Sequence, residues 1–519
     1  MKSGACRVIL AAMLLAGMSA CAVNPVTGKR EFATVSQSQE IQLGTENYGY
    51  MQQAGGGEHD ADPELTAYVR GVGGRLVEAS HRLNVAERQL PYEFVVLNSS
   101  VPNAWALPGG KLAINRGLLT EINSEAELAA VLGHEIVHAA ARHSTQQMKR
   151  GLWLQIGVIG TAILTGDSGY SDLAVGGASV GAQLLSQSYG RNAELQSDQY
   201  GMRYMSEAGY DPQGAIELQE TFVRLSEGRA SDWLSGLFAS HPPSQERVDA
   251  NKRTAATLPA GGEVGTDSYR AAMKKTMDAK PAYDAYDEGR EALADDDTGL
   301  AIEKADAAIR LFPDEAHFYA LRGDARYTVE QYDMAIQNYD IAIRRRDGFF
   351  QYYLQRGLSN EKLGNDQTAI TDLEKSNELF PTAIAHYSLG NIAVKQGNRA
   401  KAIEHYTMVA GGKGEIAESA KVALVRLDLA DNPDRYLQVR CFQDNNGNLG
   451  VSIGNATPLA VTGIRYAVQY RDAGGIRVRE GAVSGQIRAG MVANVSTGIG
   501  PYTSGSGCPV EIIAARIAE

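Results

Sequence analysis

His134-Glu135-Ile136-Val137-His138 is the stretch that decides the fold of the first half of the chain. It lies within residues 124–143, which are rich in Ala, Glu and Leu and contain a single glycine, Gly133, so we expect a helix there. Residues four apart on a helix share a face, so both imidazoles can bind one zinc ion. Glu135 can then reach a metal-bound water and take its proton. The HExxH pattern therefore predicts a hydrolytic zinc site on a helix.

Such a site needs a third protein ligand from elsewhere in the chain. In one arrangement this is the last His of HExxHxxGxxH, but Ala141 and Ser144 occupy the Gly and His positions of that pattern. In the other it is a Glu on a later helix with an acidic residue four positions on, which Glu194 and Asp198 supply. We expect Glu194 to bind the metal and Asp198 to accept a hydrogen bond from a ligand imidazole. His143 falls about 180° from His134 around a helix, which favours a surface or second-helix contact.

The flanking residues resemble the HtpX and CAAX-prenyl-protease type of zinc metallopeptidase, a gluzincin family. The matching stretches are Asn123 to Leu128 before HExxH, Arg142-His143-Ser144 after it, Arg191-Asn192-Ala193-Glu194, Asn103 to Lys111, and Ser240-His241-Pro242-Pro243-Ser244 with Arg247. One departure is Ser197, where the family usually has Ala. The resemblance implies a mainly helical zincin-type metallopeptidase domain over residues 21–257. It also implies one Zn²⁺ held by His134, His138 and Glu194, with Glu135 as general base.

The resemblance also draws attention to His241, for which three roles stay open. Its imidazole can stabilise the tetrahedral oxyanion as a catalytic group, or occupy the open metal position as a self-inhibitory ligand. Alternatively, the His-Pro-Pro turn only caps a helix. An extended substrate is expected to pair with a strand edge at residues 104–106 and 111–115. We expect residues 152–165 to form a core helix and residues 166–181 a flap over the cleft, with membrane contact as the alternative for the apolar stretch.

The N-terminus carries the features of a secretory signal peptide over residues 1–20. Lys2 and Arg7 precede a short apolar run, and small residues follow it. Met18-Ser19-Ala20-Cys21 resembles a bacterial lipobox, which implies lipidation of Cys21; cleavage of an ordinary signal peptide is the alternative. Ala22 rather than Asp follows the cysteine, which implies an outer-membrane anchor facing the periplasm.

The second half of the chain begins with a repeat. After a linker with a short helix at residues 258–281, Gly289, Gly323, Gly357 and Gly390 recur at intervals of 34, 34 and 33 residues. Ala-Ile pairs recur with them, and a 34-residue period is the tetratricopeptide pattern. We expect an α-solenoid over residues 282–430, with a capping helix at 415–430 and a surface that binds a protein partner.

The last segment, residues 435–519, changes to a β pattern. Residues 464–470 alternate apolar and polar side chains, and residues 472–475 are typical of a turn. We expect a small β-sandwich, and the segment resembles the FxLYD-type accessory domains of bacterial envelope proteins. Cys441 and Cys508 lie near its ends, where an oxidising periplasm favours a disulfide; two free buried thiols are the alternative.

Together these patterns predict a multidomain α+β protein. Its formal net charge of −12, from 49 Lys and Arg against 61 Asp and Glu, argues against nucleic acid as a main partner. The resemblance implies a zinc endopeptidase of the Gram-negative envelope that degrades misfolded or stalled outer-membrane proteins, with the repeats recruiting clients or assembly machinery. The alternative is a chaperone or scaffold lipoprotein whose protease is latent or self-inhibited.

Overall fold

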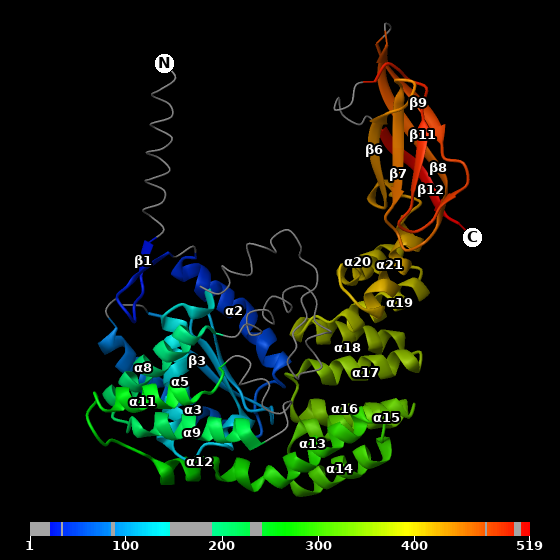
Figure 1. Ribbon diagram of the computed structural model, residues 1–519. Coiled ribbons are helices and arrows are strands. Elements are labelled where there is room, and N and C mark those ends of the chain that lie inside the picture. The colour runs from blue at the N-terminus through cyan, green and yellow to red at the C-terminus, as the bar shows by residue number, and fades with distance from the viewer. Residues whose placement is uncertain are drawn as a thin grey trace, which may run out of the picture. The chain divides into compact units, whose positions relative to one another are not determined.

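The computed structural model describes residues 21–32, 35–84, 89–145, 189–228, 241–472, 475–502 and 510–518 (Figure 1). The chain divides into two compact units, Met1–Pro381 and Thr382–Glu519. The predicted signal peptide and the predicted core helix and flap at 152–181 lie outside the described residues. Within the described ranges, no helix is both long and apolar enough to cross a membrane.

A three-stranded sheet forms one wall of the peptidase-like part of the first unit. Its order is β3 (Glu93–Leu97), β5 (Lys111–Asn115) and β4 (Ala104–Leu107), with β3 parallel and β4 antiparallel to β5. The prediction of a free edge at residues 111–115 is wrong, because β5 is the central strand and is paired on both sides. Among the described strands, β4 is the edge of this sheet that adjoins the HExxH helix α5.

Helices cover this sheet and hold the HExxH stretch. They are α2 (Gln37–Ala54), α3 (Pro63–Leu83), α4 (Arg116–Leu119), α5 (Glu125–Ala140), α8 (Arg191–Glu207), α9 (Gln213–Gly228), α11 (Gln245–Ala255) and α12 (Thr266–Asp278). Every residue of α5 is buried, and its apolar side chains share one core with α3, α8 and α9. A short two-stranded sheet, β1 (Cys21–Val23) with β2 (Arg30–Phe32), precedes them.

Gly133 and Gly201 explain how closely α5 and α8 approach each other. A Cβ atom added at Gly201 would lie 3.0 Å from the Gly133 carbonyl carbon and 3.0 Å from the His134 nitrogen. The two helices therefore touch backbone to backbone one residue before His134. This contact brings the carboxylates of α8 within reach of the imidazoles of α5.

Paired antiparallel helices with the predicted period follow. In the first unit these are α13 (Lys280–Ala294), α14 (Thr298–Leu311), α15 (Ala316–Thr328), α16 (Tyr332–Arg345), α17 (Phe350–Lys362) and α18 (Asp366–Leu379). The second unit begins with α19 (Ala383–Lys395), α20 (Arg399–Ala410) and α21 (Glu415–Asp428). The recurring glycines make room for the next helix: a Cβ at Gly323 would lie 2.7 Å from the Tyr339 ring, and one at Gly390 would lie 2.6 Å from the Tyr406 ring.

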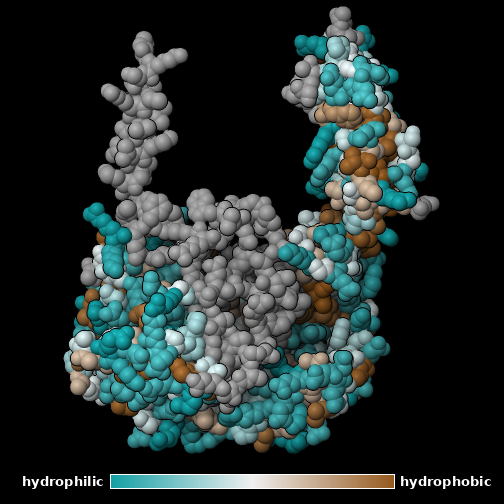
Figure 2. All heavy atoms as spheres, in the orientation of Figure 1, coloured by the Kyte–Doolittle hydropathy of each residue, from teal (hydrophilic) through white to brown (hydrophobic). Residues whose placement is uncertain are grey.

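Two small sheets end the second unit. One has the order β11 (Val492–Ser496), β7 (Leu449–Asn455), β6 (Leu437–Gln443). In the other, β8 (Val461–Asp472) pairs with β9 (Gly475–Ala482), β10 (Gln486–Ile487) and β12 (Val510–Ile517). Side chains of β7, β8 and β12 share one core. Figure 2 shows apolar residues at the surface of these strands, whereas the described helical face is mostly hydrophilic.

Candidate metal centre

Helix α5 presents His134, Glu135 and His138 from a fixed position. Ser124 caps the helix, since its Oγ accepts a hydrogen bond from the backbone N–H of Glu127 at 3.2 Å. All three functional side chains are buried, because α5 is enclosed by the rest of the fold on every side. The first prediction from the HExxH stretch, a helix that carries both imidazoles on one face, is confirmed.

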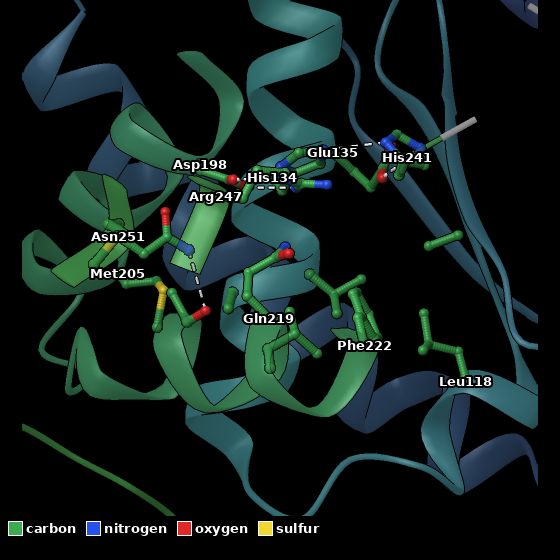
Figure 3. A pocket seen from close by; sticks show the side chains of 16 residues that line it. Leu118, His134, Glu135, Asp198, Met205, Gln219, Phe222, His241, Arg247 and Asn251 are labelled. Carbon is green, nitrogen blue, oxygen red and sulfur yellow. Dashed lines mark hydrogen bonds and ion pairs between the residues drawn. The ribbon is translucent and has the colours of Figure 1, made fainter. Parts of the chain in front are cut away.

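Four side chains converge where α5, α8 and the segment before α11 meet: those of His134, His138, Glu194 and His241. Figure 3 shows two of them, His134 and His241, beside Glu135 and Asp198. Nε2 of His134 lies 2.9 Å from Nε2 of His138 and 3.2 Å from Nδ1 of His241. Glu194 Oε1 lies 3.3 Å from His138 Nε2 and 3.1 Å from His241 Nδ1. Tetrahedral zinc ligands about 2.0–2.2 Å from one ion are about 3.3–3.6 Å apart. The separations of 2.9 to 3.3 Å lie at or a few tenths of an ångström below this range, and imidazole and carboxylate donors are the types that zinc binds.

Asp198 fixes the orientation of His134. Its Oδ1 lies 2.8 Å from His134 Nδ1. The carboxylate accepts a hydrogen bond from the Nδ1–H, so the Nε2 lone pair faces the other donors. Arg247 donates two hydrogen bonds to Asp198, both at 2.7 Å, and its Nη1 lies 2.9 Å from Glu194. Burial acts to raise the pKa of Asp198, but Arg247 outweighs it and holds that pKa below the usual value. Arg247 therefore keeps the buried carboxylate of Asp198 charged beside the imidazole of His134.

His143 fixes the orientation of His138, as Asp198 fixes that of His134. Its Nδ1 lies 3.1 Å from His138 Nδ1, and its Nε2 lies 2.6 Å from Gln196 Oε1. Because Gln196 Oε1 only accepts, His143 donates through Nε2, and its Nδ1 accepts a hydrogen bond from the Nδ1–H of His138. Burial lowers the pKa of His143 to about 4, so this imidazole is neutral at pH 7. His143 is 4% exposed, so the surface alternative is wrong and the second-helix contact is right.

Glu135 lies beside the four donors and faces one of them, His241. Glu135 Oε1 lies 3.5 Å from His241 Nε2, and neither Glu135 Oε2 nor His241 Nε2 has a hydrogen-bond partner among the described residues. Burial raises the pKa of Glu135, as suits a group that takes up a proton. Helix α11 is capped by Ser244 and not by His241, which removes the capping role from the three considered for that residue.

Tyr189 links the cluster to the edge strand, and nothing in the sequence pointed to it. Its ring centroid lies 3.8 Å from that of His138, and its hydroxyl lies 2.8 Å from Ser144 Oγ. Ser144 in turn donates to the carbonyl oxygen of Ala106 on β4 at 3.3 Å. The edge strand is thereby tied to the residues around the metal centre.

An apolar cavity adjoins the cluster on the side of α8 and α9 (Figure 3). Its walls include Leu118, Met202, Met205, Leu218 and Phe222, and Glu135 and His241 border it.

Residues 63–255 match the model of peptidase family M48, and residues 286–344 match a tetratricopeptide repeat model. The β-barrel assembly-enhancing protease of Escherichia coli O157:H7 is 28% identical over 278 residues, 52% of this chain and 54% of that protein. The Yersinia pestis protein of the same name is 31% identical over 235 residues, 44% of this chain and 46% of that one. The mitochondrial metalloendopeptidase OMA1 of Arabidopsis thaliana is 32% identical over 158 residues, 30% of each chain.

The chain thus spans about half the length of the curated relatives that it matches first. The matched region contains the HExxH helix, Glu194 and Arg247, and so coincides with the metal centre described above. The metallopeptidase resemblance and the repeat prediction are confirmed at the level of family. The chain carries a peptidase family M48 domain followed by tetratricopeptide repeats.

Proposed function

We propose that this protein is a zinc-dependent endopeptidase of the bacterial envelope. One observation carries the proposal: three imidazoles and a carboxylate converge at ligand distances, and the free carboxylate oxygen of Glu135 lies beside them. A scaffold has no physical need for a buried, unpartnered base next to a metal site. His134, His138 and Glu194 are the residues proposed to hold Zn²⁺.

When bound, zinc supplies Lewis acidity that lowers the pKa of a water to about 7. Glu135 accepts the proton of the attacking water at Oε2 and passes it to the leaving amine. Asp198 and His143 hold the ligand imidazoles in the tautomers that present Nε2. The substrate adds as a strand to β4, where backbone pairing holds an extended chain without demanding a particular sequence.

A latent protease is the second candidate, and the position of His241 favours it. Its Nδ1 lies within 3.3 Å of His134 and of both oxygens of Glu194, where a fourth ligand would exclude the attacking water. In that state the protein acts as a chaperone or scaffold for outer-membrane assembly. Withdrawal of His241 from the metal site converts the protein to the active form, in which the same imidazole can stabilise the tetrahedral oxyanion.

The cellular setting rests on the names of the relatives and on the sequence. Two of them are named β-barrel assembly-enhancing proteases, which supports misfolded or stalled outer-membrane proteins as substrates. We propose a periplasmic protein anchored through lipidated Cys21, with a protein partner on the repeats. The two C-terminal sheets would form a sandwich. Cys441 is disulfide-bonded, and we propose Cys508, which lies outside the described residues, as its partner.

The test is cleavage of an unfolded outer-membrane protein by the full-length chain and its Glu135→Gln variant, with zinc content measured on both. We expect zinc in both proteins and loss of cleavage in the variant by at least about 10³-fold. Glu127→Gln is the matched control, since Glu127 is a buried carboxylate on the same helix outside the metal centre. Equal cleavage by wild type and Glu135→Gln, or absence of zinc, overturns the assignment. Cleavage that appears only when His241 is replaced supports the latent form.

A further inference from the structure

The segment that leads into the edge strand is held from two sides. Residues 98–103 connect β3 to β4, and Arg116 at the start of α4 contacts them from within the peptidase domain. Arg116 Nε donates to Asn98 Oδ1 at 3.2 Å, and Nη2 donates to Ser100 Oγ at 3.3 Å. From the other side, residues of the first repeats contact the same two side chains.

Glu315, at the N-terminus of α15, accepts a hydrogen bond from Asn98 Nδ2 at 2.9 Å. Asp287, on α13, accepts one from Ser100 Oγ at 2.7 Å. The amide of Asn98 is therefore shared between a peptidase arginine and a repeat carboxylate, and the hydroxyl of Ser100 likewise. Repeat side chains thus complete the hydrogen bonding of a peptidase loop.

Glu315 is itself rigidly held. It is 2% exposed and also accepts hydrogen bonds from Tyr283 Oη at 2.7 Å and from the backbone N–H of His317 at 3.0 Å. The Arg116 guanidinium lies 3.5 Å from the centroid of the Tyr283 ring. This cation–π contact joins α4 directly to the repeats. A carboxylate fixed by three donors is a firm anchor for Asn98.

Residues 98–103 are also held by backbone and side-chain contacts with β5 and α4. The Asn103 carbonyl accepts from the backbone N–H of Asn115 at 2.8 Å, and the Val101 carbonyl accepts from Asn115 Nδ2 at 2.9 Å. A Cβ at Gly117 would lie 2.0 Å from the Ser100 carbonyl oxygen, so the two backbones are in contact. These contacts join residues 98–103 to β5 and α4 as one hydrogen-bonded unit that leads into Ala104, the first residue of β4.

We propose that Glu315 and Asp287 are positioning residues: from the repeats, they set the alignment of β4 with the metal centre. A partner that shifts α13 and α15 would change the binding of an extended substrate without touching the metal ligands. The inference rests on the proposed function only in assigning substrate to β4. Its structural part, the dependence of β4 on the repeats, is independent of catalysis.

The experiment uses the full-length chain and its Glu315→Ala, Glu315→Gln and Asp287→Ala variants. Amide hydrogen exchange over residues 98–107 is expected to rise about tenfold in Glu315→Ala and less in Glu315→Gln, which keeps an acceptor for Asn98. In peptide cleavage, KM should rise about fivefold with a smaller change in kcat and unchanged zinc content.

Asp372→Ala is the matched control. Asp372 is a buried carboxylate of the repeats that, within the described structure, pairs bidentately with Arg356 on the neighbouring helix α17. It should lower the stability of the repeats without raising exchange at 98–107. The proposal is overturned if exchange there is unchanged in Glu315→Ala, or if Asp372→Ala raises it equally. Failure of the peptidase assignment would show instead as cleavage by Glu135→Gln, with the exchange result unaffected.

Discussion

Nδ1 of His143 lies 3.1 Å from Nδ1 of His138, so a neutral imidazole stands where a carboxylate supports the other ligand of the HExxH pair. The two ligand histidines therefore differ in the charge behind them. Asp198 places a charged carboxylate behind His134, whereas His143 orients His138 without adding charge. This asymmetry gives the first prediction.

His143→Ala should weaken zinc binding by about 10–100-fold, because His138 loses the acceptor that fixes its tautomer. The zinc dissociation constant, measured by competition with a chromophoric chelator, gives the readout. His81→Ala, at an exposed histidine of α3, serves as the control and should leave the constant unchanged. Wild-type zinc affinity in His143→Ala would show that its contact with His138 has no positioning role.

Arg247→Ala should destabilise the first unit by about 3–5 kcal/mol, because it leaves two buried carboxylates without their cation. Arg247→Lys should restore only part of this, since one ammonium cannot reproduce the paired hydrogen bonds to Asp198. Chemical denaturation followed by circular dichroism measures both. The control is Arg253→Ala, an exposed arginine on the same helix, and equal stability of the two alanine variants would contradict the prediction.

Gly201→Ala should separate α5 from α8 and cost about 1–3 kcal/mol of stability, because the new Cβ would meet backbone atoms at 3.0 Å. Zinc affinity should fall with it, since Glu194 lies on the displaced helix. Gly71→Ala on α3 meets no atom within 4 Å and should be neutral or slightly stabilising. Thermal unfolding with and without zinc distinguishes the two variants.

Acid should loosen the contact between the peptidase domain and the first repeats. Burial lowers the pKa of His59 to about 3 and that of His317 to about 4, whereas an unfolded histidine titrates near 6.5. Below pH 6.5 these histidines are protonated in the unfolded chain but stay neutral in the folded chain. Their contribution to the free energy of unfolding is therefore present above pH 6.5 and is lost as the pH falls toward 4 and 3.

His317 alone should contribute up to about 3 kcal/mol to this loss. Its imidazole donates to the Gly56 carbonyl at 2.9 Å and accepts from Tyr352 Oη at 2.6 Å, and Gln can preserve part of this pairing. Urea denaturation at pH 7.5 and 5.0 should therefore show a smaller pH dependence in His317→Gln than in wild type. An identical dependence in both would assign the acid sensitivity to other groups.

The known pattern of zinc ligands linked Glu194 and Asp198 to the HExxH stretch, and local periodicity placed each pair on one face of its helix. It failed for His143 for a specific reason. Helix α5 ends at Ala140, and Arg142 adopts a left-handed backbone with φ 66°, so the chain turns back and a helical projection no longer applies. Arginine carries no strong signal for that conformation, which glycine would have given.

The order of the strands in the three-stranded sheet could not be predicted from the sequence either. Residues 104–107 and 111–115 are both short and buried, and only their long-range pairing shows that the second is central. The hydrogen bonds of Glu315 and Asp287 to the β3–β4 segment span 217 and 187 residues, respectively. Contacts at that separation leave no trace in local patterns, so the repeats could be predicted but not their attachment.

The backbone contact at Gly133 and Gly201 limits the size of the cation as well as the spacing of the helices. Because α5 and α8 cannot move apart without losing that contact, Glu194 on α8 stays 3.6 Å from His134 Nε2 and 3.3 Å from His138 Nε2 on α5. Calcium requires six to eight oxygen ligands at about 2.3–2.6 Å, and neither the number nor the reach is present in this cluster. The donor types of the cluster and the helix spacing held by Gly133 and Gly201 together disfavour large, hard cations.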